Sequence, residues 1–187
     1  MNKGIGLCGS HRTGKTTLAR EIAGRTGMEF LQTTTSEVFA RHGLDPSSAM
    51  DFHTRLWIQH KVVETAEAVW QGACGPFISD RTPIDMMAYT LADIQGGTLV
   101  DFAELEKYLD HCFAVTNSFF SDLVVIQPAI PLVHEEGKAA LNRSYMEHLN
   151  MLVTGLCCDE RLHCRFTLLS RGIVDLDARV GEVLKLI

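Results

Sequence analysis

Residues 9–16 read GSHRTGKT, and this short stretch decides how the rest of the chain is interpreted. Its two glycines, Gly9 and Gly14, stand five positions apart and are followed by a lysine and a hydroxyl side chain. The residues before it, 5–8, are short and apolar like a buried strand, and the residues after it place Leu18 and Ile22 at helical spacing. A strand, then G-x-x-x-x-G-K-[ST], then a helix is the arrangement of a phosphate-binding loop. A plain turn is the alternative, and the flanking pattern disfavours it.

The residue types in this loop suit a nucleotide polyphosphate. Glycines let consecutive backbone N–H groups turn toward an anion, and the following helix points its positive end at the same place. Lys15 can reach the β- and γ-phosphates, and the Thr16 hydroxyl can bind Mg²⁺. His11 is expected to be a polar loop residue and not a catalyst. The residues expected to bind ATP here are Gly9, Ser10, His11, Arg12, Thr13, Gly14, Lys15, Thr16 and Thr17.

Composition sets the class of protein. The chain has 187 residues, and we expect one domain over residues 1–187. No apolar run approaches the length of a membrane helix and no secretory signal is apparent, so we expect a cytoplasmic protein without a membrane partner. The net charge of −6 disfavours non-specific binding to nucleic acid but is compatible with a local basic cleft. The oligomeric state stays open between a monomer and a homodimer.

Short apolar segments alternate with helical patterns along the whole chain. Strands are expected at residues 5–8, 28–32, 77–80, 122–127 and 165–169. Helices are expected at residues 37–41 with Ser36 as N-cap, from Pro46 onward, over Phe52–Trp70, and at 83–94, 100–113, 139–156 and 174–187. This alternation predicts an α/β fold: a five-stranded parallel sheet with helices on both faces. Ligands of such sheets bind at the carboxyl ends of the strands, where the glycine loop, Asp80, Gln127 and Ser170 fall.

Asp80 and Arg81 form the second informative stretch. A carboxylate at the end of a buried strand can hold Mg²⁺ or accept a proton from an attacking hydroxyl, and an adjacent arginine can bind negative charge. The alternative is structural, with Asp80 capping a helix and Arg81 solvated. The neighbouring phosphate loop favours the functional interpretation.

Together, the loop at 9–17 and the Asp80-Arg81 pair resemble the P-loop nucleoside and nucleotide kinases, especially the thymidylate-kinase-like branch. The segment 124–131, with Arg143 downstream, is also similar to the nicotinamide riboside kinases. The resemblance implies the P-loop NTPase fold, Mg-ATP as phosphoryl donor, and a lid-like segment at about residues 131–145. The residues it implies are Lys15, Asp80, Arg81 and Arg143 for catalysis, and Thr16 and Asp80 for the metal.

The chain departs from thymidylate kinases in two places. Its loop carries Ser10, His11 and Arg12 where those enzymes usually have an acidic residue, and its lid segment offers only Lys138 and Arg143. A group similar to thymidylate kinases that fits this variation is the phage 5-hydroxymethyluracil DNA kinases. The leading expectation is therefore transfer of the γ-phosphate to the hydroxymethyl group of 5-hydroxymethyl-deoxyuridine in DNA, in the host cytoplasm. The alternatives are a small-molecule nucleoside or nucleoside monophosphate kinase, of the thymidylate or nicotinamide riboside type, and a nucleotide-switch ATPase.

Four further residues are candidates for binding. Glu37 could face the acceptor, and Phe52 and Arg55 lie on a long helix that borders the acceptor in related kinases, where Phe52 could stack on a base. Arg171 follows the last strand, where related kinases contact adenine. Two of them have a structural alternative: Glu37 as a first-turn residue of a helix, and Phe52 as part of the core.

Overall fold

Five parallel strands form one sheet at the centre of the molecule. The computed structural model describes residues 4–46, 48–130 and 142–186. In spatial order the strands are β2 (Glu29–Leu31), β3 (Phe77–Ser79), β1 (Gly4–Cys8), β4 (Phe120–Ile126) and β5 (Arg165–Leu169). Every neighbouring pair is parallel, so each connection must cross back over the sheet. The predicted five-stranded parallel α/β fold is confirmed.

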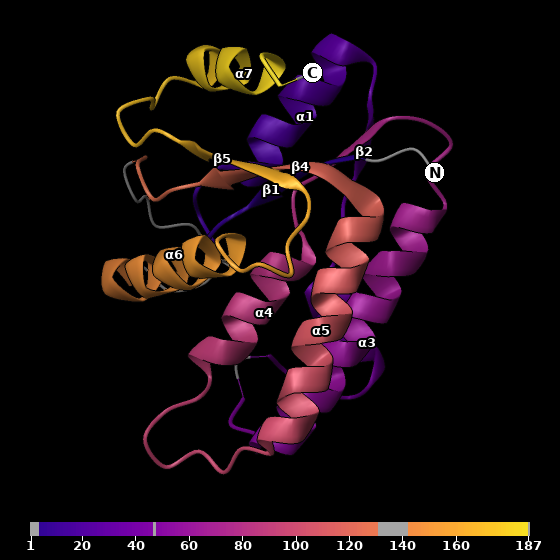
Figure 1. The fold of residues 1–187 in the computed structure, drawn as a ribbon, viewed down its shortest axis with the longest axis vertical. Coiled ribbons are helices and arrows are strands. Elements are labelled where there is room, and N and C mark those ends of the chain that lie inside the picture. Colours follow the sequence, from indigo (N-terminus) through magenta and orange to yellow (C-terminus); the bar gives the residue numbers. More distant parts are fainter. Residues whose placement is uncertain (1–3, 47, 131–141, 187) are drawn as a thin grey trace.

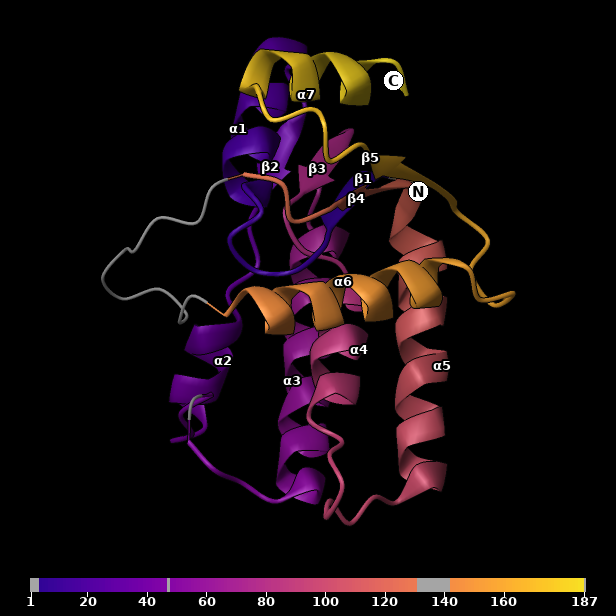
Figure 2. The same cartoon turned by 90° about the vertical axis from the view of Figure 1, so that its left-hand side faces the viewer.

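Helices cover both faces of this sheet (Figures 1 and 2). On one face lie α1 (Lys15–Thr26) and α7 (Leu176–Leu184), which pack against each other. On the other lie α2 (Thr35–Arg41), α3 (Phe52–Gln71), α4 (Pro83–Ala92), α5 (Phe102–Phe119) and α6 (Arg143–Cys157). None of the described helices is long and apolar enough to span a membrane.

Two hydrophobic cores follow from this layering, one on each face. The smaller core joins α1 and α7 to the sheet through side chains such as Leu7, Leu18 and Val180. The larger core lies on the other face and holds an aromatic cluster in which Phe120 meets the rings of Trp70 and Phe77 edge to face. Successive strand residues point to opposite faces, so every strand in the middle of the sheet supplies both cores.

One predicted helix is absent and another begins earlier than predicted. In place of the helix expected from Pro46, a turn closes from Ser48 N–H to the Asp45 carbonyl. Helix α3 begins at Phe52 as predicted, and its N-cap is Asp51, whose carboxylate accepts a hydrogen bond from the Thr54 N–H at 2.8 Å. Helix α2 begins at Thr35 and not after Ser36: its N-cap is Thr34, whose side chain forms no capping hydrogen bond, so the predicted cap at Ser36 is wrong.

Helix α5 is longer than the predicted 100–113, although it begins two residues later, at Phe102. Phe102 is 70% exposed while Leu105, three positions further along, is buried. Asp101 caps the helix by accepting hydrogen bonds from two N–H groups of the first turn, which places Phe102 at the exposed first position. Strand β4 follows α5 directly at Phe120.

Replacing Phe120 with Ala is expected to lower the free energy of unfolding by about 3–5 kcal/mol, because it opens a cavity between the rings of Trp70 and Phe77. Phe102→Ala is the matched control, since the same atoms are removed from an exposed site, and it should change stability by about 0.5 kcal/mol or less. Urea unfolding followed by tryptophan fluorescence measures both. Equal losses in the two variants would contradict the assignment of the core.

Candidate functional site

The loop between β1 and α1 has the backbone geometry that the glycine pattern predicts. Gly9 has a φ of 142° and Gly14 a φ of 86°, and Arg12 is the one non-glycine with positive φ among the described residues, at 58°. At Gly9 a Cβ atom would lie 2.4 Å from the Ile126 carbonyl oxygen, so only glycine fits against β4. The chain therefore turns sharply at the carboxyl end of β1 and enters α1 with its N-terminal N–H groups at the loop.

Lys15 folds back over this loop. Its Nζ donates to the carbonyl oxygens of Gly9 at 2.6 Å and Ser10 at 2.7 Å, and the Thr13 hydroxyl also donates to Ser10 O at 3.0 Å. Burial lowers the pKa of Lys15, while the nearby Asp85 carboxylate opposes that shift. The Ser10 hydroxyl oxygen is buried and forms no hydrogen bond among the described residues. A buried hydroxyl and an ammonium group at one loop fit the oxygen atoms of a bound phosphate.

Asp80 lies beside the end of the loop. Gly6 of β1 pairs with Ser79 of β3, so the residues that follow both strands emerge at the same edge of the sheet. The Thr16 hydroxyl donates to Asp80 Oδ2 at 2.5 Å, and Asp80 is largely buried. These two side chains are the predicted metal ligands. Two oxygen donors in contact fit Mg²⁺, which prefers oxygen ligands.

Arg81 faces a group of aromatic rings. Its guanidinium lies 5.9 Å from the centre of the Tyr89 ring in α4. The Tyr89 hydroxyl oxygen accepts the His11 N–H at 3.0 Å, and the His11 ring lies 6.0 Å from that of Tyr145 in α6. Burial raises the pKa of Tyr89 to about 12, so its hydroxyl stays protonated at neutral pH. The loop, α4 and α6 thus meet next to Asp80.

The three predicted acceptor residues lie in different environments. Phe52 is buried in the larger core, so its ring has little surface for a base, and this burial does not support a stacking role. Arg55 pairs with Asp93 at 2.9 Å and lies over the Phe39 ring. Glu37 is exposed in the first turn of α2.

The predicted arginines beyond β4 are on the surface. Arg143 is the first residue of α6 and is exposed, and the lid positions 131–141 lie outside the described residues. Arg171 follows β5 and forms a bidentate pair with Glu147 at 2.6 and 2.7 Å. Its Nε also donates to Gln127 Oε1 at 3.1 Å, which joins the ends of β4 and β5. Thr17 is exposed on α1.

Asp85 is a residue of the site that the sequence analysis did not select. It is fully buried, and its Oδ1 accepts the Gly9 N–H at 2.6 Å while Oδ2 accepts both N–H and hydroxyl of Thr82. Burial raises the pKa of Asp85, and the cations of Lys15 and Arg81 oppose that shift. The spacing Thr82-x-x-Asp85 signals a helix start. Its hydrogen bond to Gly9, 76 positions away, leaves no pattern in the neighbouring sequence from which it could be predicted.

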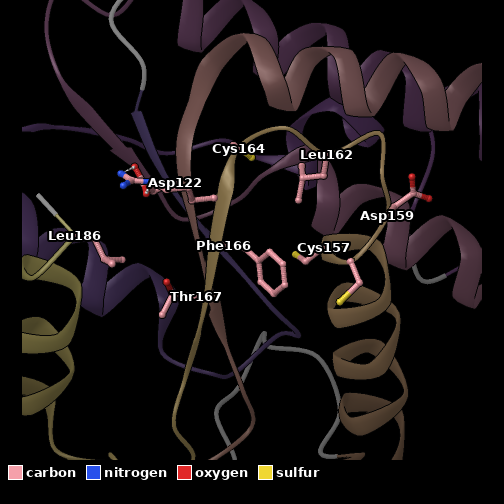
Figure 3. Close-up of a pocket in the computed structure, with 10 residues that line it drawn as sticks. Asp122, Cys157, Asp159, Leu162, Cys164, Phe166, Thr167 and Leu186 are labelled. Atoms are coloured by element: carbon pink, nitrogen blue, oxygen red, sulfur yellow. Dashed lines mark hydrogen bonds and ion pairs between the residues drawn. The ribbon is translucent and has the colours of Figure 1, made fainter.

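One pocket lies away from this site. It has a volume of about 590 Å³ and lies between the start of β5 and the end of α6, where Cys157, Cys164 and Phe166 line it (Figure 3). Asp122 at the start of β4 also lines it, so the pocket is at the amino ends of the strands, opposite to the glycine loop. No group of three His, Cys, Asp or Glu side chains placed to hold a metal ion occurs among the described residues.

A family model described as an AAA domain matches residues 5–125, from β1 to β4. The chain belongs to this AAA domain family. No curated protein matches the sequence at a significant level.

Several solved structures share the fold of this chain. Deoxyadenosine kinase from M. mycoides, with dCMP and dCDP bound, has a TM-score of 0.68 at 15% identity and covers 98% of this chain and 97% of its own. Thymidylate kinase from Candida albicans gives 0.63 at 13% identity, covering 100% and 91%. NadR protein in complex with NR gives 0.70 at 16%, covering 98% of this chain and 49% of its own. The fold expected from the resemblance to P-loop nucleoside and nucleotide kinases is confirmed.

Replacing Asp85 with Ala is expected to lower the free energy of unfolding by about 3 kcal/mol, since the buried Gly9 and Thr82 N–H groups lose their acceptor. Asp101→Ala removes a cap from an exposed helix start and should cost only about 1 kcal/mol. Urea unfolding compares the two variants. A loss no larger for Asp85→Ala than for Asp101→Ala would contradict a structural role beyond helix capping.

Proposed function

We propose that the chain is a P-loop kinase that moves the γ-phosphate of Mg-ATP to a nucleoside-like acceptor. The observation that carries this proposal is the contact between Thr16 and Asp80 directly beside the loop that holds Lys15. It places a hydroxyl, a carboxylate and an ammonium group within one small region at the carboxyl edge of the sheet. These are the groups that phosphoryl transfer from a nucleoside triphosphate requires.

Each side chain has a role in the transfer that follows from its position. An acceptor oxygen forms a bond to the γ-phosphorus while the bond from that phosphorus to the oxygen bridging to the β-phosphate breaks, and ADP leaves. Lys15 and Arg81 stabilise the charge on the phosphoryl oxygens. Asp80 holds the metal or accepts the proton of the acceptor hydroxyl. When bound, Mg²⁺ would neutralise charge on the β- and γ-phosphates.

The acceptor is proposed to lie beside Arg81, where Tyr89, Tyr145 and His11 gather. Aromatic rings next to a cation suit a flat base joined to a sugar with a hydroxyl or phosphate group. The bound molecules named for the deoxyadenosine kinase structures, dCMP, dCDP, dCTP and dATP, support a free nucleoside or nucleotide as acceptor. A hydroxymethylated base in DNA has less support, because Phe52 is buried and the net charge is −6.

A nucleotide-switch ATPase is the rival from another class. Such a module would hydrolyse ATP without an acceptor, whereas a kinase would turn over slowly until the acceptor is added. The presence of Arg81 and of the aromatic group beside Asp80 favours a kinase, since a switch needs no acceptor site.

Asp80→Asn is expected to lower turnover at least a hundredfold, in the range for loss of a general base, while ATP affinity changes much less. The variant keeps the shape of the side chain and removes only its charge. Asp110→Asn, on the surface and paired with Arg161, is the control and should keep wild-type turnover. Steady-state kinetics with the accepted substrate, together with thermal melting, measures the effect. Unchanged turnover in Asp80→Asn would leave Asp80 a purely structural residue.

The acceptor class is tested with γ-labelled ATP over nucleosides, nucleoside monophosphates, nicotinamide riboside and hydroxymethylated DNA. We expect label on a free nucleoside or monophosphate and none with Lys15→Ala, because that variant lacks the cation at the phosphates. Label on hydroxymethylated DNA alone would replace the small-molecule assignment with the DNA kinase. Rapid release of inorganic phosphate with no labelled acceptor would contradict the kinase and favour the ATPase.

A further inference from the structure

Arg179 in α7 is a buried cation that contacts the glycine loop. It is only 3% exposed, although it is charged and lies near the C-terminal end of the chain. Its Nη1 donates to the Thr13 carbonyl oxygen at 3.0 Å and its Nε donates to the Ile173 carbonyl oxygen at 2.8 Å. One guanidinium therefore joins two loops that are 160 residues apart in the sequence.

The bond to Thr13 orients the peptide that leads to Gly14. In a trans peptide the C=O and the N–H of one plane point in opposite directions. Because the Thr13 C=O points at Arg179, the N–H of Gly14 points away from α7 and toward the opposite side of the loop. The left-handed φ of 86° at Gly14 then lets the chain enter α1. Arg179 thus fixes the direction of one of the N–H groups that a phosphate-binding loop uses.

The hydrogen bond from Arg179 to the Ile173 carbonyl oxygen holds the loop that follows β5. This loop turns at Ser170, whose carbonyl accepts the Ile173 N–H at 3.1 Å, and it carries Arg171. It leaves the sheet at the carboxyl end of β5, and its Ile173 packs against the smaller core, which contains Val180 of α7. Arg179 therefore sets the separation between the glycine loop and the loop after β5.

The charge of Arg179 has no acidic partner among the described residues. Other arginines of the chain pair with carboxylates, such as Arg25 with Asp177 and Arg55 with Asp93, whereas Arg179 donates only to carbonyl oxygens. Burial lowers the pKa of Arg179. A buried charge without a counter-ion is costly, and an anion at the adjacent loop would offset that cost.

We propose that Arg179 is a positioning residue for the nucleotide: it orients the Gly14 N–H toward the phosphates, holds the loop after β5 at the distance a base-bearing ligand needs, and supplies positive charge behind the phosphate loop. The ligand class is a nucleoside triphosphate. This inference rests on the proposed function, because it needs a polyphosphate at the glycine loop.

The test is a binding titration of AMP-PNP and of inorganic tripolyphosphate to wild type, Arg179→Gln and Arg179→Lys. Arg25→Gln is the matched control, because it removes another arginine contact made by α7, the pair of Arg25 in α1 with Asp177, and lies away from both loops. Circular dichroism and thermal melting establish that each variant is folded. Calorimetry gives the dissociation constants without any need for turnover.

We expect Arg179→Gln to weaken both ligands at least tenfold and Arg25→Gln to leave both within about twofold. Arg179→Lys keeps the charge but not the two-pronged geometry, so it should recover part of the tripolyphosphate affinity and less of the AMP-PNP affinity. If Arg179→Gln fails to fold, the comparison of Arg179→Lys with Arg25→Gln still tests the proposal.

Equal affinities in the Arg179 variants and Arg25→Gln would overturn the proposal, since Arg179 would then only hold α7 in place. Loss for AMP-PNP alone, with tripolyphosphate unchanged, would overturn the part that concerns the phosphates. Failure of the wild type to bind either ligand would instead contradict the proposed function, which keeps the two failures distinguishable.

Discussion

The hydrogen bond from the Gly9 N–H to the buried Asp85 carboxylate is the contact on which the site depends. Gly9 begins the glycine loop, and Asp85 lies in the first turn of α4, four residues after Arg81. The parallel pairing of β1 with β3 brings these segments to one edge, but pairing alone leaves the loop free to move relative to α4. A single carboxylate that also caps α4 removes that freedom. The carboxylate thereby holds the glycine loop, which carries Lys15 at its end, against the start of α4.

The charges around the loop do not balance within the described structure. Lys15, Arg81 and Arg179 contribute three cations, and Asp80 and Asp85 contribute two carboxylates. Because the loop and its neighbours are partly or fully buried, the excess positive charge raises the affinity for an anion more than it would on an open surface. Backbone N–H groups at the start of α1 add to the same field. An acidic protein can therefore hold a polyphosphate at this one place.

The sequence predicted those parts of the fold and of the site whose signal lies within a short stretch of neighbouring residues. The loop at 9–16 and the Asp80-Arg81 pair are short motifs next to apolar strands, so both the parallel sheet and the ends of β1 and β3 could be predicted. Phe52 shows the limit: helical spacing places it on a face of α3, but which face is buried depends on packing against distant helices. Asp85 and Arg179 could not be found, because their partners, Gly9 and Thr13, lie 76 and 166 positions away.

In the proposed kinase, the phosphoryl-donor side and the acceptor side of the site are built in different ways. The donor side consists mainly of backbone groups held in place by Gly9, Gly14 and a few buried side chains. The acceptor side is made of side chains from separate helices, among them Tyr89 of α4 and Tyr145 of α6, with Arg55 of α3 paired to Asp93 nearby. A single substitution there changes which molecule fits without disturbing the sheet. For the proposed kinase, the fold therefore constrains the phosphoryl-donor site far more tightly than the acceptor site, and the choice of acceptor depends on side chains such as these.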